Sequence, residues 1–229
     1  MSSVRVVNPT PWEVSQPIVF RYMQRGYVDA FFDDGSLRLS SFGEFRKHPQ
    51  EQRIDTQEGR FQLSHFQKGL KPEDNRYFHL SGLTNPHTYV LCGHMSNDPE
   101  LHDENNDAYV AIQDTVSFAG VIASKLTGFV RGMEGPCVYQ TSRSLAYRLG
   151  GVPLTELGSL DEPPNLPQLR ALIAERLGHL PYFLKHQSYR ADAEYRWIWF
   201  VNPPAQPYID LKVPEAREFC FADNSRAWT

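Results

Sequence analysis

The sequence predicts an α+β fold: a single domain over residues 1–229 with a mixed, largely antiparallel, split sheet and flanking helices. Strand-length apolar runs and helical patterns follow one another without strict strand–helix–strand alternation, which disfavours a purely parallel sheet. No low-complexity linker divides the 229 residues, and 41% hydrophobic with 13% aromatic content is enough for one substantial core.

The first expected strand spans residues 18–23 and ends on Arg21 and Tyr22. A helix should follow over 24–34, where four apolar residues fall at helical spacing, and Gly35 is a natural left-handed stop. An arginine at the end of a strand suits the binding of an anion. It is equally compatible with a salt-bridged residue at the rim of the sheet.

The next strand is expected at 36–42, where leucines alternate with polar residues before the strand closes on Ser40, Ser41 and Phe42. Residues 43–76 are charged and weakly periodic. We predict one short helix there, followed by a long surface loop of the kind that forms lids or mobile segments.

Two continuous apolar runs, 88–94 and 108–113, predict buried strands on either side of an acidic loop. Thr115 or Ser117 is the expected cap of a helix that runs to about residue 126. The remaining elements are a short strand at 137–140, a proline-rich connector at 161–167, a helix at 168–177, and strands at 193–201 and 207–213.

The strand near 193–201 carries an unusual pattern of charges. Asp192, Glu194 and Arg196 stand at every second position, so they should share one face of the strand while aromatic residues occupy the other. Such a row of charges on one face of a strand is typical of a functional site. The alternative is an edge strand whose outer face is wetted by alternating charges.

Composition excludes several classes of function. A net charge of −4 and a pI near 6.1 do not describe a protein that binds nucleic acid through a broad basic surface, but they are compatible with a local basic groove. The three cysteines are widely spaced and odd in number, which favours reduced thiols in a cytoplasmic protein. No apolar run approaches the length of a membrane span, so no membrane association is expected.

Motifs of the common enzyme classes are missing. The chain holds neither a Gly-x-Ser-x-Gly elbow nor a glycine-rich phosphate loop. His94 and His102 stand eight residues apart, without the tightly paired ligands of zinc sites, so we expect no metal and interpret this segment as a solvated acidic loop.

The polar residues at 21–22, 38–42 and 192–196 together suit one reaction, the cleavage of a glycosidic bond in a nucleotide sugar. The fork of Arg21 matches a diphosphate, and serine hydroxyls can hold a ribose. An aromatic ring can stack on a flat cationic base such as nicotinamide. A carboxylate beside the ribose stabilises the oxocarbenium-like transition state that forms as the base departs.

The order of these motifs resembles a family of uncharacterised domains from phage-defence and abortive-infection loci. The resemblance covers roughly residues 18–201 and rests on four short motifs: Phe20–Tyr22, Gly35–Ser41, Val90–Ser96 and Lys185–Arg196. That family in turn is similar to the ADP-ribosyltransferase superfamily, which includes toxins that modify nucleic acids.

The resemblance implies an ADP-ribosyltransferase-like fold with NAD as substrate. It places Glu194 as the catalytic carboxylate, with Asp192 orienting the acceptor, and Arg21 at the NAD-gripping position. Tyr22 would belong to the same binding site, and the strand that closes on residues 40–42 would support the pocket. The chain departs from the pattern in two respects: little chain separates the first two strands, and a clean Ser-Thr-Ser is missing.

The function implied is a toxin or phage-defence effector that splits NAD at the nicotinamide–ribose bond and passes ADP-ribose to a nucleic acid or protein. Hydrolysis of NAD, with water as the acceptor, would use the same pocket. An antitoxin or inhibitory partner is compatible with this setting. The rival is a non-catalytic binding module of a defence system that recognises a phage protein or nucleic acid.

Overall fold

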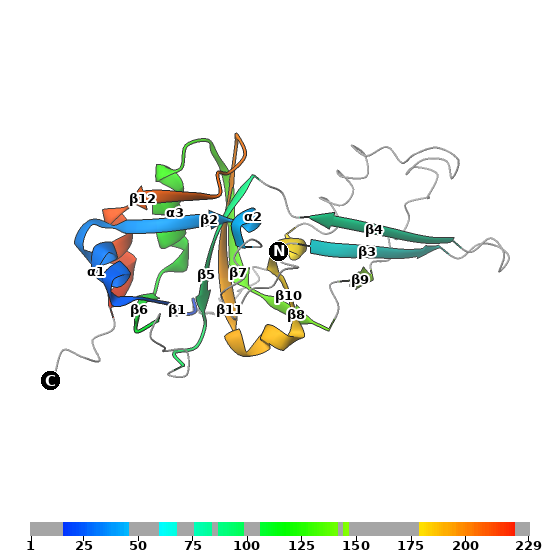
Figure 1. The fold of residues 1–229 in the computed structure, drawn as a ribbon, viewed down its shortest axis with the longest axis horizontal. Coiled ribbons are helices and arrows are strands. Elements are labelled where there is room, and N and C mark those ends of the chain that lie inside the picture. The colour runs from blue at the N-terminus through cyan, green and yellow to red at the C-terminus, as the bar shows by residue number, and fades with distance from the viewer. Residues whose placement is uncertain are drawn as a thin grey trace, which may run out of the picture.

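The computed structural model describes residues 16–45, 60–67, 76–83, 87–98, 106–141, 144–146 and 179–222. It combines an open, mostly antiparallel sheet with few helices, in agreement with the predicted α+β class (Figure 1). Every strand pair of the main sheet is antiparallel. Its strands are β1 (Val19–Met23), β2 (Ser36–Ser41), β5 (Thr88–His94), β6 (Ala108–Ile112), β7 (Phe129–Pro136), β11 (Glu194–Val201), β12 (Tyr208–Lys212) and β13 (Cys220–Ala222).

The sheet divides at β5. One edge of β5 pairs with β11 along its whole length, from Thr88 to His94. The other edge is shared: β2 pairs with Tyr89 and Val90, whereas β1 pairs only with His94. Strands β1 and β2 therefore meet the same edge of β5 at opposite ends, and β1 continues into β6 and β13.

Helix α1 (Arg25–Asp34) joins β1 to β2 and buries Val28 and Phe31. It ends at Gly35, whose φ of 77° is left-handed and whose N–H donates to the Phe31 carbonyl at 2.9 Å. This is the predicted helix and the predicted stop. Glycine suits the position because it reaches this conformation without a steric penalty.

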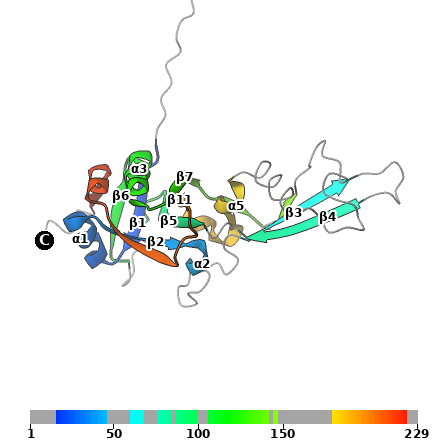
Figure 2. The same ribbon diagram turned by 90° about the horizontal axis from the view of Figure 1, so that it is seen from above.

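Helix α3 (Thr115–Lys125) packs on one face of the main sheet (Figure 2). Its cap is Asp114, whose carboxylate accepts the Ser117 N–H at 2.9 Å, so the predicted caps Thr115 and Ser117 lie inside the helix. The buried Phe118 ring lies 5.5 Å from Trp197, centroid to centroid. The helix therefore covers the aromatic face of β11.

Strand β11 is buried along its whole length between β5 and β7. The alternative of a wetted edge strand is therefore wrong. Alternate residues fall into two apolar clusters: Tyr195, Trp197 and Trp199 in the larger, Ile198 and Phe200 in the smaller. The strand begins at Glu194, because the preceding residues form a 3-10 helix, η4 (Gln187–Asp192).

The expectation of a loop through residues 43–76 is wrong in part. After the short helix α2 (Phe42–Phe45), the chain forms β3 (Arg60–Gln67) and β4 (Arg76–Leu83), which pair antiparallel and extend away from the main sheet (Figures 1 and 2). β9 (Ser144–Ala146) joins β3 in parallel. Charged residues weaken the alternation of this segment, so its pattern does not reveal strands that depend on a partner far along the chain.

The short strand predicted at 137–140 is β8 (Val138–Gln140), which pairs in parallel with β10 (Leu184–His186). A one-turn helix, α5 (Leu180–Phe183), precedes β10. The chain also forms a 3-10 helix, η5 (Pro214–Phe219), before β13. The predicted connector at 161–167 and helix at 168–177 lie outside the described residues.

Candidate functional site

The candidate site lies where β5 ends at His94. His94 is aligned across the sheet with Phe20 of β1 on one side and with Glu194 of β11 on the other. Side chains of residues directly opposite in a sheet point to the same face. The register therefore brings the first and last predicted segments of the site to one end of one strand.

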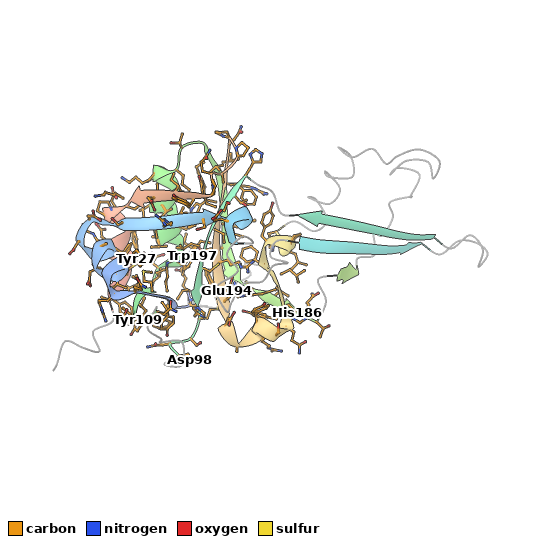
Figure 3. The ribbon with its side chains drawn as sticks, viewed as in Figure 1. Tyr27, Asp98, Tyr109, His186, Glu194 and Trp197 are labelled. Carbon is orange, nitrogen blue, oxygen red and sulfur yellow. The ribbon has the colours of Figure 1, made fainter. Side chains whose placement is uncertain are left out.

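A local turn places Glu194 at the start of its strand. Ala193 adopts a left-handed conformation with φ of 41° as the chain leaves η4. Two contacts then fix the Glu194 backbone: its N–H donates to the Tyr139 hydroxyl at 2.7 Å, and its carbonyl accepts the Cys137 N–H at 2.8 Å. Both polar groups of the Glu194 backbone are therefore hydrogen-bonded, which fixes the point from which its side chain starts (Figure 3).

The Glu194 side chain is buried among cations. Its Oε2 accepts from the Lys185 ammonium and its Oε1 from Nε of Arg196, and both partners are almost wholly buried. The Cys137 thiol lies 3.7 Å from Oε1 as a third, weaker donor. Only 7% of Glu194 is exposed. The predicted face shared by Glu194 and Arg196 is thus present as an ion pair.

Lys185 connects this pair to the second predicted acid. Its Nζ also lies 3.0 Å from Oδ2 of Asp192, at the end of η4. The Asp192 side chain is 18% exposed, against 9% for that of Glu194. The four charges of Lys185, Asp192, Glu194 and Arg196 sum to zero, which satisfies the requirement that buried charges be paired.

Electrostatics keep Glu194 ionised. Burial by itself would raise its pKa, but the adjacent Arg196 guanidinium and Lys185 ammonium outweigh burial and hold the pKa well below its usual value. Burial works against the charge of Lys185, yet Glu194 and Asp192 together raise the pKa of the ammonium. Burial also raises the pKa of the Tyr139 phenol to about 12. Glu194 and Lys185 are therefore both charged at neutral pH, and the phenol is neutral.

Arg21 lies on β1, which reaches the same end of β5 along the edge opposite to β11. Its Nη1 donates to the Cys92 carbonyl at 3.1 Å, and its buried Nε has no hydrogen-bond partner. Burial lowers the pKa of this guanidinium. Among the described residues no carboxylate pairs with Arg21, and no hydrogen bond or ion pair joins it to Glu194. Alternation along β1 assigns it to the face opposite Glu194.

Tyr22 lies on the face of Glu194, beside His94. Its ring meets the His94 ring edge-on at 5.6 Å and the Tyr109 ring at the same distance. The Tyr22 hydroxyl donates to Asn97 at 2.8 Å and accepts the Asp98 N–H at 2.9 Å. Together with Phe20, which packs on Tyr109, these rings form an aromatic surface next to the buried acid.

The predicted supporting strand lies elsewhere. Ser40 pairs with Val90 and Ser41 with Tyr89, which lie about 13 and about 17 Å from His94 along β5 at about 3.3 Å per residue. The Ser41 hydroxyl accepts the Glu44 N–H at 3.3 Å and so helps to start α2. Phe42 is the first residue of α2. The structure brings Arg21, Tyr22, Asp192 and Glu194 to one end of β5, and residues 40–42 to the other.

Sequence patterns missed two residues that define the site. In the sequence, His94 stands out only as one of two histidines too widely spaced for a zinc site, and Lys185 only as part of a short motif. The run that ends in His94 indicated the end of a strand, but the alignment of that end with Phe20 and Glu194 depends on strand pairing. The described residues hold no cluster of three or more His, Cys, Asp or Glu suited to a metal ion.

Comparisons with known proteins give no match: no family model, no curated protein and no solved structure is significantly similar to the chain. In the part of the chain that the structure describes, no helix has the length and apolar character needed to cross a membrane.

Proposed function

We propose that this chain is an ADP-ribosyltransferase-like enzyme, a toxin or phage-defence effector that cleaves NAD at the nicotinamide–ribose bond and transfers ADP-ribose to a nucleic acid or protein. One observation carries the proposal. An ionised carboxylate, Glu194, begins a late strand at the end of β5, on the same face of the sheet as the aromatic surface of Phe20, Tyr22 and Tyr109.

The chemistry requires a carboxylate that stays charged. In the proposed reaction the C1′–N bond breaks, its electron pair leaves with nicotinamide, and an oxocarbenium-like ribose develops positive charge. Glu194 stabilises that charge electrostatically. The acceptor then forms a bond to C1′ and loses a proton. The low pKa of Glu194 suits this role, because the carboxylate stays an anion at any physiological pH.

Substrate needs access to an oxygen that Lys185 holds in the free protein. Lys185 already contacts the more exposed Asp192 at 3.0 Å. The ammonium can therefore remain paired with Asp192 when Oε2 of Glu194 turns to a ribose hydroxyl. The aromatic surface around Tyr22 and Tyr109 lies on the face of Glu194 and supplies ring faces and edges for the base. Arg21 points to the other face of the sheet, so it is assigned no contact with the diphosphate.

The first test is NAD turnover by the purified protein. We expect release of nicotinamide, faster when the correct acceptor is present, and a loss of at least about 100-fold in Glu194→Gln, the order of effect of removing one electrostatic stabiliser of a transition state. Incubation with labelled NAD and separate pools of protein, RNA and DNA identifies the acceptor. Free ADP-ribose without labelled macromolecule would select hydrolysis instead.

Glu134→Gln is the matched control. Glu134 lies on β7, next to β11, aligned with Trp197 and therefore on the opposite face of the sheet from Glu194. Its carboxylate accepts hydrogen bonds from Thr115 and Tyr195. This variant should keep wild-type turnover. Equal turnover by Glu194→Gln would remove Glu194 from the mechanism.

A non-catalytic binding module is the second candidate. The specific observation in its favour is that both oxygens of Glu194 are engaged by buried cations, an arrangement that also serves purely to hold the strand ends together. This candidate predicts no nicotinamide release, no thermal shift with NAD, and binding of a phage protein or nucleic acid that is insensitive to Glu194→Gln.

A further inference from the structure

One row of side chains crosses five strands of the main sheet and ends at Glu194. Phe221 of β13 is aligned with Ala111 of β6, which is aligned with Phe20 of β1. Phe20 is aligned with His94 of β5, and His94 with Glu194 of β11. Aligned residues share a face of the sheet. Since neighbouring strands lie about 4.8 Å apart, Phe20 is about 10 Å and Phe221 about 19 Å from Glu194 across the sheet.

The end of this row remote from Glu194 lies on an exposed apolar surface. Phe221 is 40% exposed, and Ile18, directly before β1, is 44% exposed. The helices α1, α3 and η5 pack on the opposite face, because their buried residues share a cluster with Val19, which alternates with Ile18 and Phe20. We call Ile18, Phe20 and Phe221 the apolar face. Exposed apolar surface of this kind marks sites of interaction.

Two carboxylates lie at the strand ends beside the apolar face. Asp98 follows β5 and donates its N–H to the Tyr22 hydroxyl, and Asp107 immediately precedes β6 (Figure 3). The Asp107 carboxylate accepts the Arg25 backbone N–H at 2.7 Å. The one cation within β1, β6 and β13 is Arg21, which alternation assigns to the opposite face. A nucleic acid requires cations that neutralise its phosphates, whereas a protein segment with lysine or arginine complements carboxylates.

We infer that the apolar face is the docking surface for a protein acceptor of ADP-ribose, a segment that lays apolar side chains on Phe20 and Phe221 and places a lysine or arginine near Asp107. This inference rests on the proposed function, because it names the class of acceptor. The row ends at Glu194, so a segment held on Phe221 can extend toward the ribose that Glu194 faces. There a nucleophile of the segment bonds to C1′ and loses its proton, while nicotinamide leaves with the electron pair of the broken bond.

Docking is measured without NAD, by fluorescence polarisation of labelled probes on the full-length protein. The probes are a peptide that alternates leucine with arginine and lysine, the same peptide with glutamate at each basic position, and a single-stranded oligothymidine. We expect the basic peptide to bind at least about tenfold more tightly than the other two, with a Kd that rises with salt. Equal or tighter binding of the acidic peptide or of the oligothymidine would overturn the inference.

Two variants and a control assign this binding to the apolar face. Phe221→Ser and Ile18→Ser each remove a partly exposed side chain, so both should unfold near the wild-type temperature. Each should raise the Kd of the basic peptide about tenfold, the effect of one lost apolar contact. Val130→Ser is the control: it removes a side chain on β7 that is 63% exposed, and it should leave the Kd unchanged. A wild-type Kd in both variants of the apolar face would contradict the inference.

Labelled NAD separates this inference from the proposed function. An excess of the basic peptide should slow the labelling of a protein pool, because peptide and acceptor compete for the apolar face. Label in RNA or DNA rather than protein would overturn the inference. Nicotinamide release without binding of the basic peptide would overturn the inference alone. Peptide binding without nicotinamide release would overturn the proposed function, and the acceptor role of the surface with it.

Discussion

Lys185 serves two carboxylates at once, and this sharing decides how the buried charges of the site respond to mutation. Removing the ammonium leaves Glu194 with Arg196 alone and leaves Asp192 without its partner at 3.0 Å. A buried charge that loses its partner costs far more than the intact pair contributes. The double variant should therefore lose less stability than the Lys185 variant alone.

We predict that Lys185→Met lowers the free energy of unfolding by about 3 kcal/mol, the usual cost of breaking a buried pair. Adding Glu194→Gln in the same chain should restore part of the loss, because the net charge of the remaining cluster then returns from −1 to zero. Urea denaturation of wild type, both single variants and the double variant completes the cycle. Additive losses would show that Lys185 and Glu194 are not coupled.

At the scale of elements, the turn from α1 into β2 is held by one backbone conformation. Gly35 has φ of 77°, and its carbonyl accepts the Val213 N–H at 2.8 Å. A Cβ at this position would overlap the backbone of Val213 and Pro214. The glycine therefore joins the first helix to the segment that leads into η5.

Gly35→Ala should destabilise the protein by at least about 2 kcal/mol, because the left-handed conformation and the overlap with Pro214 act together. Gly26→Ala is the matched control. Gly26 lies in α1 with no atom within 4 Å of an added Cβ, so alanine there should stabilise by about 0.5–1 kcal/mol. Thermal and urea unfolding measure the stability of both variants. A Gly35→Ala protein as stable as wild type would contradict the role of the left-handed glycine in this turn.

Elements with local signals were predictable from the sequence. The apolar run at 88–94 became β5 with the same bounds, and the helix expected over 24–34 ends at the expected glycine. Elements that depend on distant partners were not. β7 ends in a glycine-containing run, and β11, the strand with which it pairs, lies more than 50 residues later in the sequence. Its pattern by itself does not distinguish a strand from a loop.

At the scale of the whole molecule, the site is a product of strand register. The sequence indicated that Arg21, Tyr22, Asp192 and Glu194 were chemically notable, and the sheet gathers these four at one end of β5. Nothing in the sequence indicated that the strand closing on residues 40–42 pairs near the other end of β5. The alternation of apolar residues decides which side chains share a face, because a slip by one residue would move all of them to the other face. A slip by two residues keeps that pattern, so the pattern does not tell which residues pair between strands 70 residues apart.

The charged cluster also sets how the stability of the whole molecule depends on pH. The pKa of Glu194 is lower in the folded chain than in the unfolded chain, where it lies at about 4.3. Its contribution is therefore complete above that unfolded value and is lost as the pH falls toward the folded value. The pKa of Lys185 is raised, so its contribution is lost only on the alkaline side, as the pH rises through the folded pKa.

We therefore predict that the free energy of unfolding falls as the pH drops below about 4.3, and that the fall is smaller in Glu194→Gln, because glutamine binds no proton on unfolding. Urea titrations at pH 7, 5, 4 and 3 measure the difference between the two proteins, which cancels the contributions of surface carboxylates such as Asp34 and Asp210, present in both. Between pH 7 and 5 the difference should stay constant. If the free energies of unfolding of the two proteins stayed parallel down to pH 3, Lys185 and Arg196 would not be keeping Glu194 ionised. The electrostatic basis for the proposed role of Glu194 would then be lost.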